Sequence, residues 1–237
     1  MCTVTYLPKA NDSFILTSSR DEKFLRKTAE PPSIHKSSDQ MIMFPKDPQG
    51  GGTWMAVSEH GQTICLLNGA FEKHISEPPY RKSRGLVAVD ALQFNTLDSF
   101  GKEYDLNGIE PFTIVGINNM NLQEIRWDGK HSHIKNFDPD LPHIWSSITL
   151  YAPEVIEKRK QWFKNWIKEQ KEFNVDSIRS FHHLGGEGDN NAILINRDNA
   201  MLTVSITTVF KEADRVSMIY EDLSIKKIYR TSFKEKV

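Results

Sequence analysis

The sequence contains very little cysteine. Among 237 residues only Cys2 and Cys65 are cysteines, too few for a disulfide framework, and a pair of cysteines alone does not make a zinc site. The eight histidines show no spacing that is typical of metal ligands. We therefore expect no metal ion and no other cofactor.

The sequence also lacks an excess of either charge, because 30 Lys and Arg residues stand against 31 Asp and Glu residues, a formal net charge of -1. Nucleic-acid-binding proteins usually carry a basic excess or stripe, so we expect no nucleic-acid partner. No apolar run approaches the roughly 18 residues of a membrane span, and the first residues do not resemble a signal peptide. These absences predict a cytoplasmic protein that handles a small-molecule substrate or ligand, and they leave its oligomeric state open.

What the sequence does contain is a series of strand patterns interrupted by helical ones. No repeat, linker or change of composition divides the chain, so we predict one domain over residues 1–237. Runs rich in β-branched and aromatic residues predict strands that pair as hairpins. These cover residues 3–8, 13–19, 50–58, 62–69, 111–119, 122–129, 133–137 and 143–148, a hairpin within 191–210 that turns at 197–199, and two strands near the C-terminus. Residues 23–50, rich in Pro, Ser and Lys, are predicted to form a long surface loop.

Helical spacing occurs in three places. Residues 83–94 show it with Ser83 as a candidate N-cap. A long amphipathic helix is predicted from Pro153, because proline suits the first helical position, and a shorter helix is predicted near 175–184. Hairpin-connected strands with helices in the middle of the chain predict an α+β fold in which helices cover antiparallel sheets.

Cys2 directly follows the initiator methionine. It could be an ordinary residue at the start of a strand. Alternatively, removal of Met1 would give Cys2 both a thiol and a free α-amine, whose unperturbed pKa is near 8. A neutral α-amine can take the thiol proton and so activate the sulfur for attack on a carbonyl.

The charged cluster "SSRDE" ends the second predicted strand with Arg20 and Asp21. If the first two strands pair, this end lies close to Cys2, where Arg20 could stabilise a thiolate or an incoming carboxylate and Asp21 could accept hydrogen bonds from the α-amine. Strand alternation points adjacent residues to opposite faces, so both reach one site only if the chain turns there. The alternative interpretation is a surface ion pair with Glu22 and Lys23.

Glycines 50–52 precede a predicted strand and lack the Lys and Ser/Thr of a phosphate-binding loop, so they indicate a close backbone approach. Trp54, which follows them, could line a substrate pocket or belong to the core. Cys65 alternates within a strand pattern and is interpreted as a small buried hydrophobe.

Four segments together resemble a known family. "MC" at the start, "SRDE" at 19–22, "GGTWMAVS" at 51–58 and "LLN" at 66–68 are arranged as in the NRDE family, which includes the transport and Golgi organisation 2 proteins. The resemblance implies a four-layer αββα sandwich of the N-terminal nucleophile hydrolase type. Its relatives include cysteine amidases such as penicillin V acylase and bile salt hydrolase.

The resemblance also implies roles for individual residues. Cys2 would be the nucleophile, with Arg20 and Asp21 beside it, and Asn68 would contribute to the oxyanion hole. Asn191 matches a family asparagine that opens the late hairpin.

Three departures from the relatives bear on activity. Ser19 replaces the family asparagine of "NRDE", and Arg20 is adjacent to its aspartate rather than three residues from it as in the acylases. Ser147 stands where relatives carry a catalytic asparagine, and it is predicted to contact the substrate through a hydroxyl of shorter reach.

Two alternative functions are therefore predicted. One is a cysteine hydrolase that cleaves a non-peptide amide through an acyl-thioester, and the other is a catalytically degenerate ligand-binding or trafficking protein with the same fold.

Overall fold

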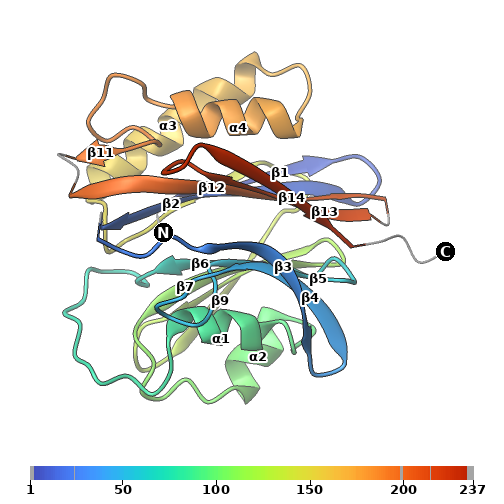
Figure 1. Ribbon diagram of the computed structural model, residues 1–237, viewed down its shortest axis with the longest axis vertical. Helices are drawn as coiled ribbons and strands as arrows, with labels where there is room; N and C mark the ends of the chain where they lie inside the picture. The colour runs from blue at the N-terminus through green and yellow to red at the C-terminus, as the bar shows by residue number, and fades with distance from the viewer. Residues whose placement is uncertain (1–2, 24, 198–199, 214, 234–237) are drawn as a thin grey trace.

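The computed structural model describes residues 3–23, 25–197, 200–213 and 215–233, and in this part of the chain two seven-stranded sheets pack face to face between layers of helices. Figure 1 shows one pair of helices above the upper sheet and another pair below the lower sheet. All strand pairs are antiparallel. The α+β class and the four-layer αββα sandwich are therefore confirmed.

The upper sheet joins the two ends of the chain. Its order is β10-β1-β2-β12-β13-β14, with β11 paired to β12. Its strands are β1 (Thr3–Lys9), β2 (Ser13–Lys23), β10 (His143–Ser146), β11 (Asn196–Arg197), β12 (Met201–Glu212), β13 (Arg215–Asp222) and β14 (Lys227–Ser232). The predicted late hairpin is present as β11 and β12, but Arg197, which was predicted to lie in its turn, belongs to β11. The other two predicted turn residues, Asp198 and Asn199, lie outside the described residues. This sheet places the N-terminal hairpin of β1 and β2 between β10 and the strands from the last fifth of the sequence, with β2 paired to β12.

The lower sheet follows the chain from one edge to the other, in the order β3-β4-β5-β6-β7-β8-β9. Its strands are β3 (Glu30–Ser37), β4 (Gln40–Lys46), β5 (Met55–Ser58), β6 (Thr63–Asn68), β7 (Phe112–Asn118), β8 (Asn121–Trp127) and β9 (Ser132–Phe137). The predicted hairpins over 50–69 and 111–129 are confirmed within these bounds.

The prediction of a long loop over residues 23–50 was wrong, because β3 and β4 form a hairpin there. Two prolines, Pro31 and Pro32, lie inside β3. They are tolerated because β3 is an edge strand, where a missing backbone N–H does not break a ladder between neighbouring strands. At the turn between β3 and β4, Ser38 takes a positive φ of 53°. Because this position is not a glycine, the sequence gave no indication of the turn.

The helices are α1 (Arg84–Ala91), α2 (Leu97–Glu103), α3 (Pro153–Glu169) and α4 (Val175–Leu184). Ser83 is the N-cap of α1, and Pro153 occupies the first position of α3, as predicted. Helix α2 was not predicted from the sequence; its N-cap is Thr96, which forms a capping box with Ser99. Helices α1 and α2 cover the lower sheet, and α3 and α4 cover the upper one (Figure 1).

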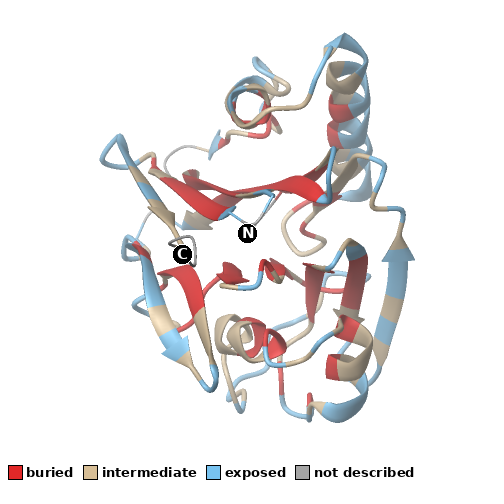
Figure 2. Ribbon diagram, turned by 90° about the vertical axis from the view of Figure 1, so that its right-hand side faces the viewer, coloured by how far each residue is buried: buried red, intermediate tan, exposed pale blue. Residues whose placement is uncertain are grey.

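The two faces of each strand in the upper sheet belong to different layers. Phe14 and Leu16 of β2 enter the large core between the sheets, whereas Ile15 packs with Phe163 of α3 and Phe181 of α4. Figure 2 shows the buried residues concentrated on the two facing sheets. This alternation decides which side chains at the end of β2 face the interior between the sheets.

None of the helices in the described part of the chain is long and apolar enough to span a membrane.

Candidate functional site

The candidate site lies where β1 begins and β2 ends. Cys2 is outside the described residues, but Thr3 is paired with Ser19 in β2. On the other side of β2, Arg20 is paired with Ser205 and Asp21 with Thr203 of β12, and the register shifts between these two pairs. The first described residue of the chain therefore lies beside the "SRDE" segment, as the sequence analysis expected.

Arg20 is almost completely buried, with 2% of its surface exposed. Its Nη2 donates a hydrogen bond to Oδ2 of Asp47 at 3.0 Å and lies 3.2 Å from Oε1 of Glu22. The guanidinium also lies over the ring of Trp54, 4.5 Å from the centroid. These contacts hold a positive charge inside the molecule, where a cation is stable only if it is paired and hydrogen-bonded.

Asp47 was not identified from the sequence, although it organises this region. Its Oδ2 also accepts from Arg26, at 3.1 Å from Nε and 2.5 Å from Nη2, and its Oδ1 accepts from the backbone N–H groups of Gln49 and Gly50. Burial would raise the pKa of the Asp47 carboxyl, but the hydrogen bond from Arg26 and the charges of Arg20 and Arg26 outweigh burial and lower it. The signal in the sequence was an aspartate followed by proline and a glycine run, which is typical of a turn.

A cavity of about 400 Å³ opens beside these residues. Three of the predicted site residues line it, namely Arg20, Trp54 and Asn68. The other lining residues are Glu22, Arg26, Asp47, Gly50, Gly52, Thr53, Leu66, Tyr80, Lys82, Ser83, Arg84, Gly85 and Glu110. Charged and hydrogen-bonding side chains therefore dominate its wall, with few apolar ones.

One wall of the cavity depends on glycine. A Cβ placed on Gly52 would lie 2.1 Å from the carbonyl carbon of Gly85 at the start of α1. Ser83 Oγ donates to the carbonyl of Gly50 at 2.9 Å, and Thr53 N–H donates to the carbonyl of Gly85 at 3.2 Å. The glycine run thus allows a close backbone approach, as the sequence analysis predicted, and joins the turn after β4 to α1.

Arg84 occupies the same wall and pairs with Glu110 at 3.0 Å. Glu110 contacts His74 through its other oxygen at 3.1 Å. Burial lowers the pKa of Arg84, and the charge of Glu110 counteracts part of this effect.

Asn68 and Ser147 are neighbours, but only Asn68 lines the cavity. Ser147 Oγ donates to the backbone carbonyl of Asn68 at 2.9 Å and lies 3.1 Å from Thr149 Oγ1. Ser147 is fully buried. Its hydroxyl therefore supports the end of β6 from behind instead of facing the cavity.

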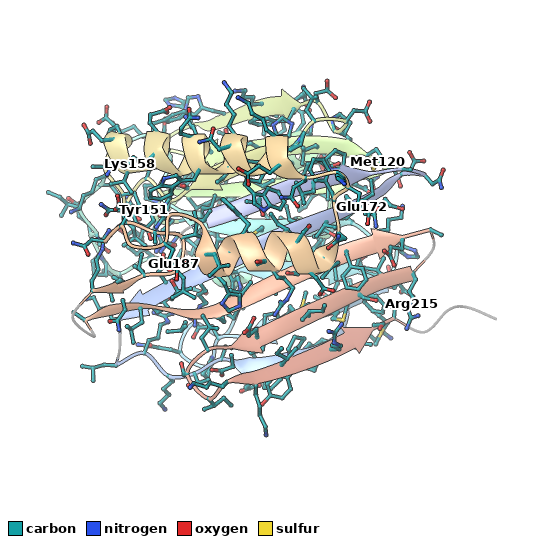
Figure 3. All side chains as sticks on the ribbon, turned by 90° about the horizontal axis from the view of Figure 1, so that it is seen from above. Met120, Tyr151, Lys158, Glu172, Glu187 and Arg215 are labelled. Carbon is teal, nitrogen blue, oxygen red and sulfur yellow. The ribbon has the colours of Figure 1, made fainter. Side chains whose placement is uncertain are left out.

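Asp21 points to the opposite face of β2 from Arg20. Its Oδ1 accepts from Thr203 Oγ1 at 2.6 Å, and its Oδ2 accepts from the hydroxyl of Tyr151. Figure 3 shows Tyr151 at the same end of the helix layer as Lys158 and Glu187. Strand alternation is thus kept at Arg20 and Asp21, and only Arg20 faces the cavity.

Asn191 also lies on the helix side of the upper sheet. Its Oδ1 accepts from Arg197 Nη2 at 2.7 Å, and its carbonyl accepts from Arg159 Nε at 3.1 Å. Arg159 is fully buried and donates from Nη1 to Thr3 Oγ1 at 2.6 Å. Asn191 is therefore connected to the first described residue of β1 through Arg159, and it does not line the cavity.

His182 is a second buried group whose role was not predicted from the sequence. Its Nε2 lies 2.8 Å from Thr5 Oγ1, and its Nδ1 lies 2.7 Å from Ser19 Oγ. Burial lowers the pKa of its imidazole to about 3, with the charge of Arg179 acting in the same direction. At neutral pH this histidine is uncharged and ties β1 to β2 just behind the site.

Cys65 is fully buried in β6, and burial raises the pKa of its thiol to about 12. At neutral pH it is therefore not a nucleophile. In the described part of the chain no group of three or more His, Cys, Asp or Glu side chains is arranged to hold a metal ion.

Comparison with known proteins agrees with this architecture. The sequence profile of the family described as "Transport and Golgi organisation 2" matches residues 1–219. A cysteine-to-alanine variant of conjugated bile acid hydrolase from Clostridium perfringens has a similar structure, with a TM-score of 0.64 at 10% identity, covering 100% of this chain and 94% of that chain. An arginine-to-leucine variant of that hydrolase gives a TM-score of 0.61 at 10% identity, with 97% and 92% covered.

A third similar structure is the Caenorhabditis elegans ortholog of N-acylethanolamine-hydrolyzing acid amidase, with a TM-score of 0.60 at 11% identity and 87% and 92% covered. These neighbours have the N-terminal nucleophile hydrolase fold, which confirms the fold implied by the family resemblance. No curated protein matches this sequence.

Proposed function

Because the chain belongs to the transport and Golgi organisation 2 family, and because it shares its fold with amide hydrolases, we propose that it hydrolyses a non-peptide amide with Cys2 as nucleophile. The observation that carries this proposal is the cavity lined by Arg20, Trp54 and Asn68. It lies at the end of β2, where Thr3 is paired with Ser19.

The reaction has two halves. After removal of Met1, the sulfur of Cys2 attacks the amide carbonyl, and the thiol proton passes through the α-amine of Cys2 to the leaving nitrogen as the C–N bond breaks. The product of this half is an acyl-thioester on Cys2 and a free amine. Water then attacks the thioester, gives its proton through the α-amine to sulfur, and releases the carboxylic acid.

The opposite orientations of Arg20 and Asp21 suit a terminal nucleophile, whose sulfur and α-amine need different partners. We propose that the guanidinium of Arg20 stabilises the thiolate of Cys2. Asp21 is proposed to accept from the protonated α-amine of Cys2.

Asn68 is proposed to donate to the oxyanion from its side-chain amide. It ends β6 and lines the cavity. Ser147, through its hydrogen bond to the carbonyl of Asn68, then acts as a positioning residue. Asn191 would act through Arg159, which binds both its carbonyl and Thr3.

A catalytically degenerate ligand-binding protein is the second candidate. One observation favours it: Ser147, at the position of a relative's catalytic asparagine, is buried and points at the backbone of Asn68. A cavity that keeps its polar wall without this asparagine could retain ligand binding after losing turnover.

The two candidates differ in the chemistry of Cys2. The test is the intact mass of the protein from its native host, before and after iodoacetamide at pH 7. The hydrolase predicts loss of Met1 and fast single labelling that is abolished in Cys2→Ala, while the buried thiol of Cys65 stays unlabelled. Retention of Met1 in the native host would contradict the hydrolase, since no α-amine would exist on Cys2, and would leave ligand binding.

A further inference from the structure

Two guanidinium groups besides Arg20 line the cavity, and the proposed reaction does not use them. Arg26 approaches from the segment after β2, and Arg84 is the first residue of α1. They come from different parts of the fold, since Arg26 lies in the connection between β2 and β3, which joins the two sheets, and α1 covers the lower sheet. A hydrolase that needed only a nucleophile and an oxyanion hole would have no use for either charge.

The carboxylates of the cavity wall are already engaged by protein donors. Both oxygens of Asp47 accept hydrogen bonds, from two arginines and two backbone N–H groups. Glu110 contacts His74 with one oxygen and Arg84 with the other. Glu22 pairs through Oε1 with Arg20 Nη2 at 3.2 Å and with Arg26 Nε at 3.6 Å. Each of the three carboxylates of this wall is therefore already paired with a cationic side chain of the protein.

Both arginines keep N–H groups that no protein acceptor uses. Arg26 uses Nε and Nη2 on Asp47, and its Nη1 has no hydrogen-bond partner among the described residues. Arg84 uses Nη1 on the carbonyl of Pro111 and Nη2 on Glu110, and its Nε is likewise without a partner in the described ranges. Lys82 also lines the cavity, but its ammonium is bound by Asp90.

The formal charges of the lining nearly balance. Arg20, Arg26 and Arg84 face Glu22, Asp47 and Glu110, and the charge of Lys82 is matched by Asp90. The unused N–H donors, not a net positive charge, distinguish this wall. Besides burial, the positive charge of Arg26 contributes to lowering the pKa of Arg84. The pKa of Arg26 itself is raised, because its hydrogen bond to Asp47 and the charges of Glu22 and Asp47 outweigh burial. Both guanidinium groups therefore stay positively charged, and each would attract a carboxylate bound in the cavity.

We propose that Arg26 and Arg84 form a carboxylate-binding subsite, so that the substrate is an amide carrying a carboxylate away from its scissile bond. Guanidinium groups suit this role because their planar N–H donors match the geometry of a carboxylate. The substrate carbonyl would lie toward Asn68 and Arg20, and the carboxylate toward Arg26 and Arg84. This inference rests on the proposed function only in calling the ligand a substrate. The subsite would bind the carboxylate whether or not the amide is then hydrolysed.

The test compares two ligands of nearly equal shape on the Cys2→Ala variant, which cannot form the thioester. Hippurate carries a carboxylate, and hippuramide replaces it with a neutral amide. Both are small enough for a cavity of about 400 Å³. Titration calorimetry is expected to show hippurate binding at least about tenfold more tightly than hippuramide, because bidentate charge-assisted hydrogen bonds are stronger than neutral ones. Added salt should reduce this preference.

Variants then locate the subsite. Arg26→Gln and Arg84→Gln, each combined with Cys2→Ala, are expected to bring the two affinities close together. Arg81→Gln is the matched control, since it removes the same charge three residues before Arg84 from a residue that does not line the cavity. Arg84→Gln leaves Glu110 with one partner fewer and could unfold the protein. Arg26, with 31% of its side chain exposed, then provides the decisive variant.

Equal affinities for the two ligands, no binding of either at millimolar concentration, or a preference that survives in Arg26→Gln would overturn the subsite. Failure of the proposed function is visible separately. If Cys2 is unreactive toward iodoacetamide but hippurate is preferred, the subsite stands and hydrolysis does not. If Cys2 is reactive and no preference exists, the hydrolase stands and the subsite does not.

Discussion

The carboxylate of Asp47 lies against the guanidinium of Arg20, with Oδ2 accepting a hydrogen bond from Nη2 at 3.0 Å. Asp47 begins the turn after β4 in the lower sheet, and Arg20 belongs to β2 in the upper sheet. This ion pair therefore connects the two sheets at the point where the cavity opens. It also fixes the direction in which the remaining N–H groups of Arg20 can point.

Asp47→Asn should destabilise the fold strongly. Removing one partner of a buried ion pair typically costs about 3–5 kcal/mol, and we expect the lower end of this range because Glu22 still lies 3.2 Å from Arg20 Nη2. The free energy of unfolding from urea denaturation measures this loss. Asp98→Asn is the control, because its pair with Lys102 is exposed on α2 and its loss should cost less than about 1 kcal/mol. Similar losses in both variants would contradict the anchoring role of Asp47.

His182 should make stability depend on pH below neutrality. Its pKa is lowered by burial to about 3, whereas an unfolded histidine has a pKa near 6.5. Between these values the unfolded state binds a proton that the folded state does not, so the free energy of unfolding falls as the pH falls. The contribution is about 1.4 kcal/mol per pH unit in this window.

Denaturation of the wild type and His182→Asn between pH 7 and pH 4 checks the slope, which should become shallower in the variant. His183→Asn is the matched control, because this neighbour in α4 has 35% of its side chain exposed. An unchanged slope in His182→Asn would show that this histidine is protonated in the folded state.

Gly52→Ala should be much more damaging than Gly51→Ala. The new Cβ at position 52 would meet the backbone of Gly85 at 2.1 Å, which no side-chain rotation can relieve. We expect a loss of at least about 3 kcal/mol, together with separation of α1 from the cavity wall. Gly51 has open space around its Cβ but a φ of +73°, so alanine there should cost only about 1–2 kcal/mol. Thermal unfolding of the two variants gives the comparison, and equal losses would refute the close-approach argument.

Ser147→Ala should slow acylation of Cys2 less than Asn68→Ala does. Loss of a direct oxyanion donor costs about 10²–10³ in rate, whereas loss of one supporting hydrogen bond of about 1 kcal/mol costs about fivefold. The burst of p-nitrophenol from p-nitrophenyl acetate measures acylation. Ser146→Ala, one residue earlier in β10, serves as the control. A larger effect in Ser147→Ala than in Asn68→Ala would mean that the serine itself contacts the oxyanion.

Most strands were predictable because each carries its own local pattern. The segments 3–8 and 13–19 alternate β-branched and aromatic residues, and they pair as a hairpin in the structure. Residues 30–46 escaped prediction because the edge strand β3 contains two prolines and exposes most of its side chains to solvent. An edge strand needs only one hydrogen-bonded neighbour, so its sequence is less constrained.

The candidate site was predictable only in part. The sequence indicated Arg20, Trp54 and Asn68, which line one cavity. It did not indicate Asp47 or Arg84, because their significance depends on contacts with Arg20 and Glu110, which lie more than 20 residues away along the chain. Nor did it separate Asn191 and Ser147 from the cavity wall, since strand register decides which face a side chain occupies.

The sequence by itself therefore determined the secondary structure of most of the chain, the family and the residues at the end of β2, because these depend on local pattern and motif order. Only the tertiary structure decided that Arg20 and Asp21 serve opposite faces, that Asp47 bridges the sheets, and that Arg26 and Arg84 line one cavity. These relationships arise when two sheets pack face to face, and no local pattern in the chain encodes the distance between their side chains.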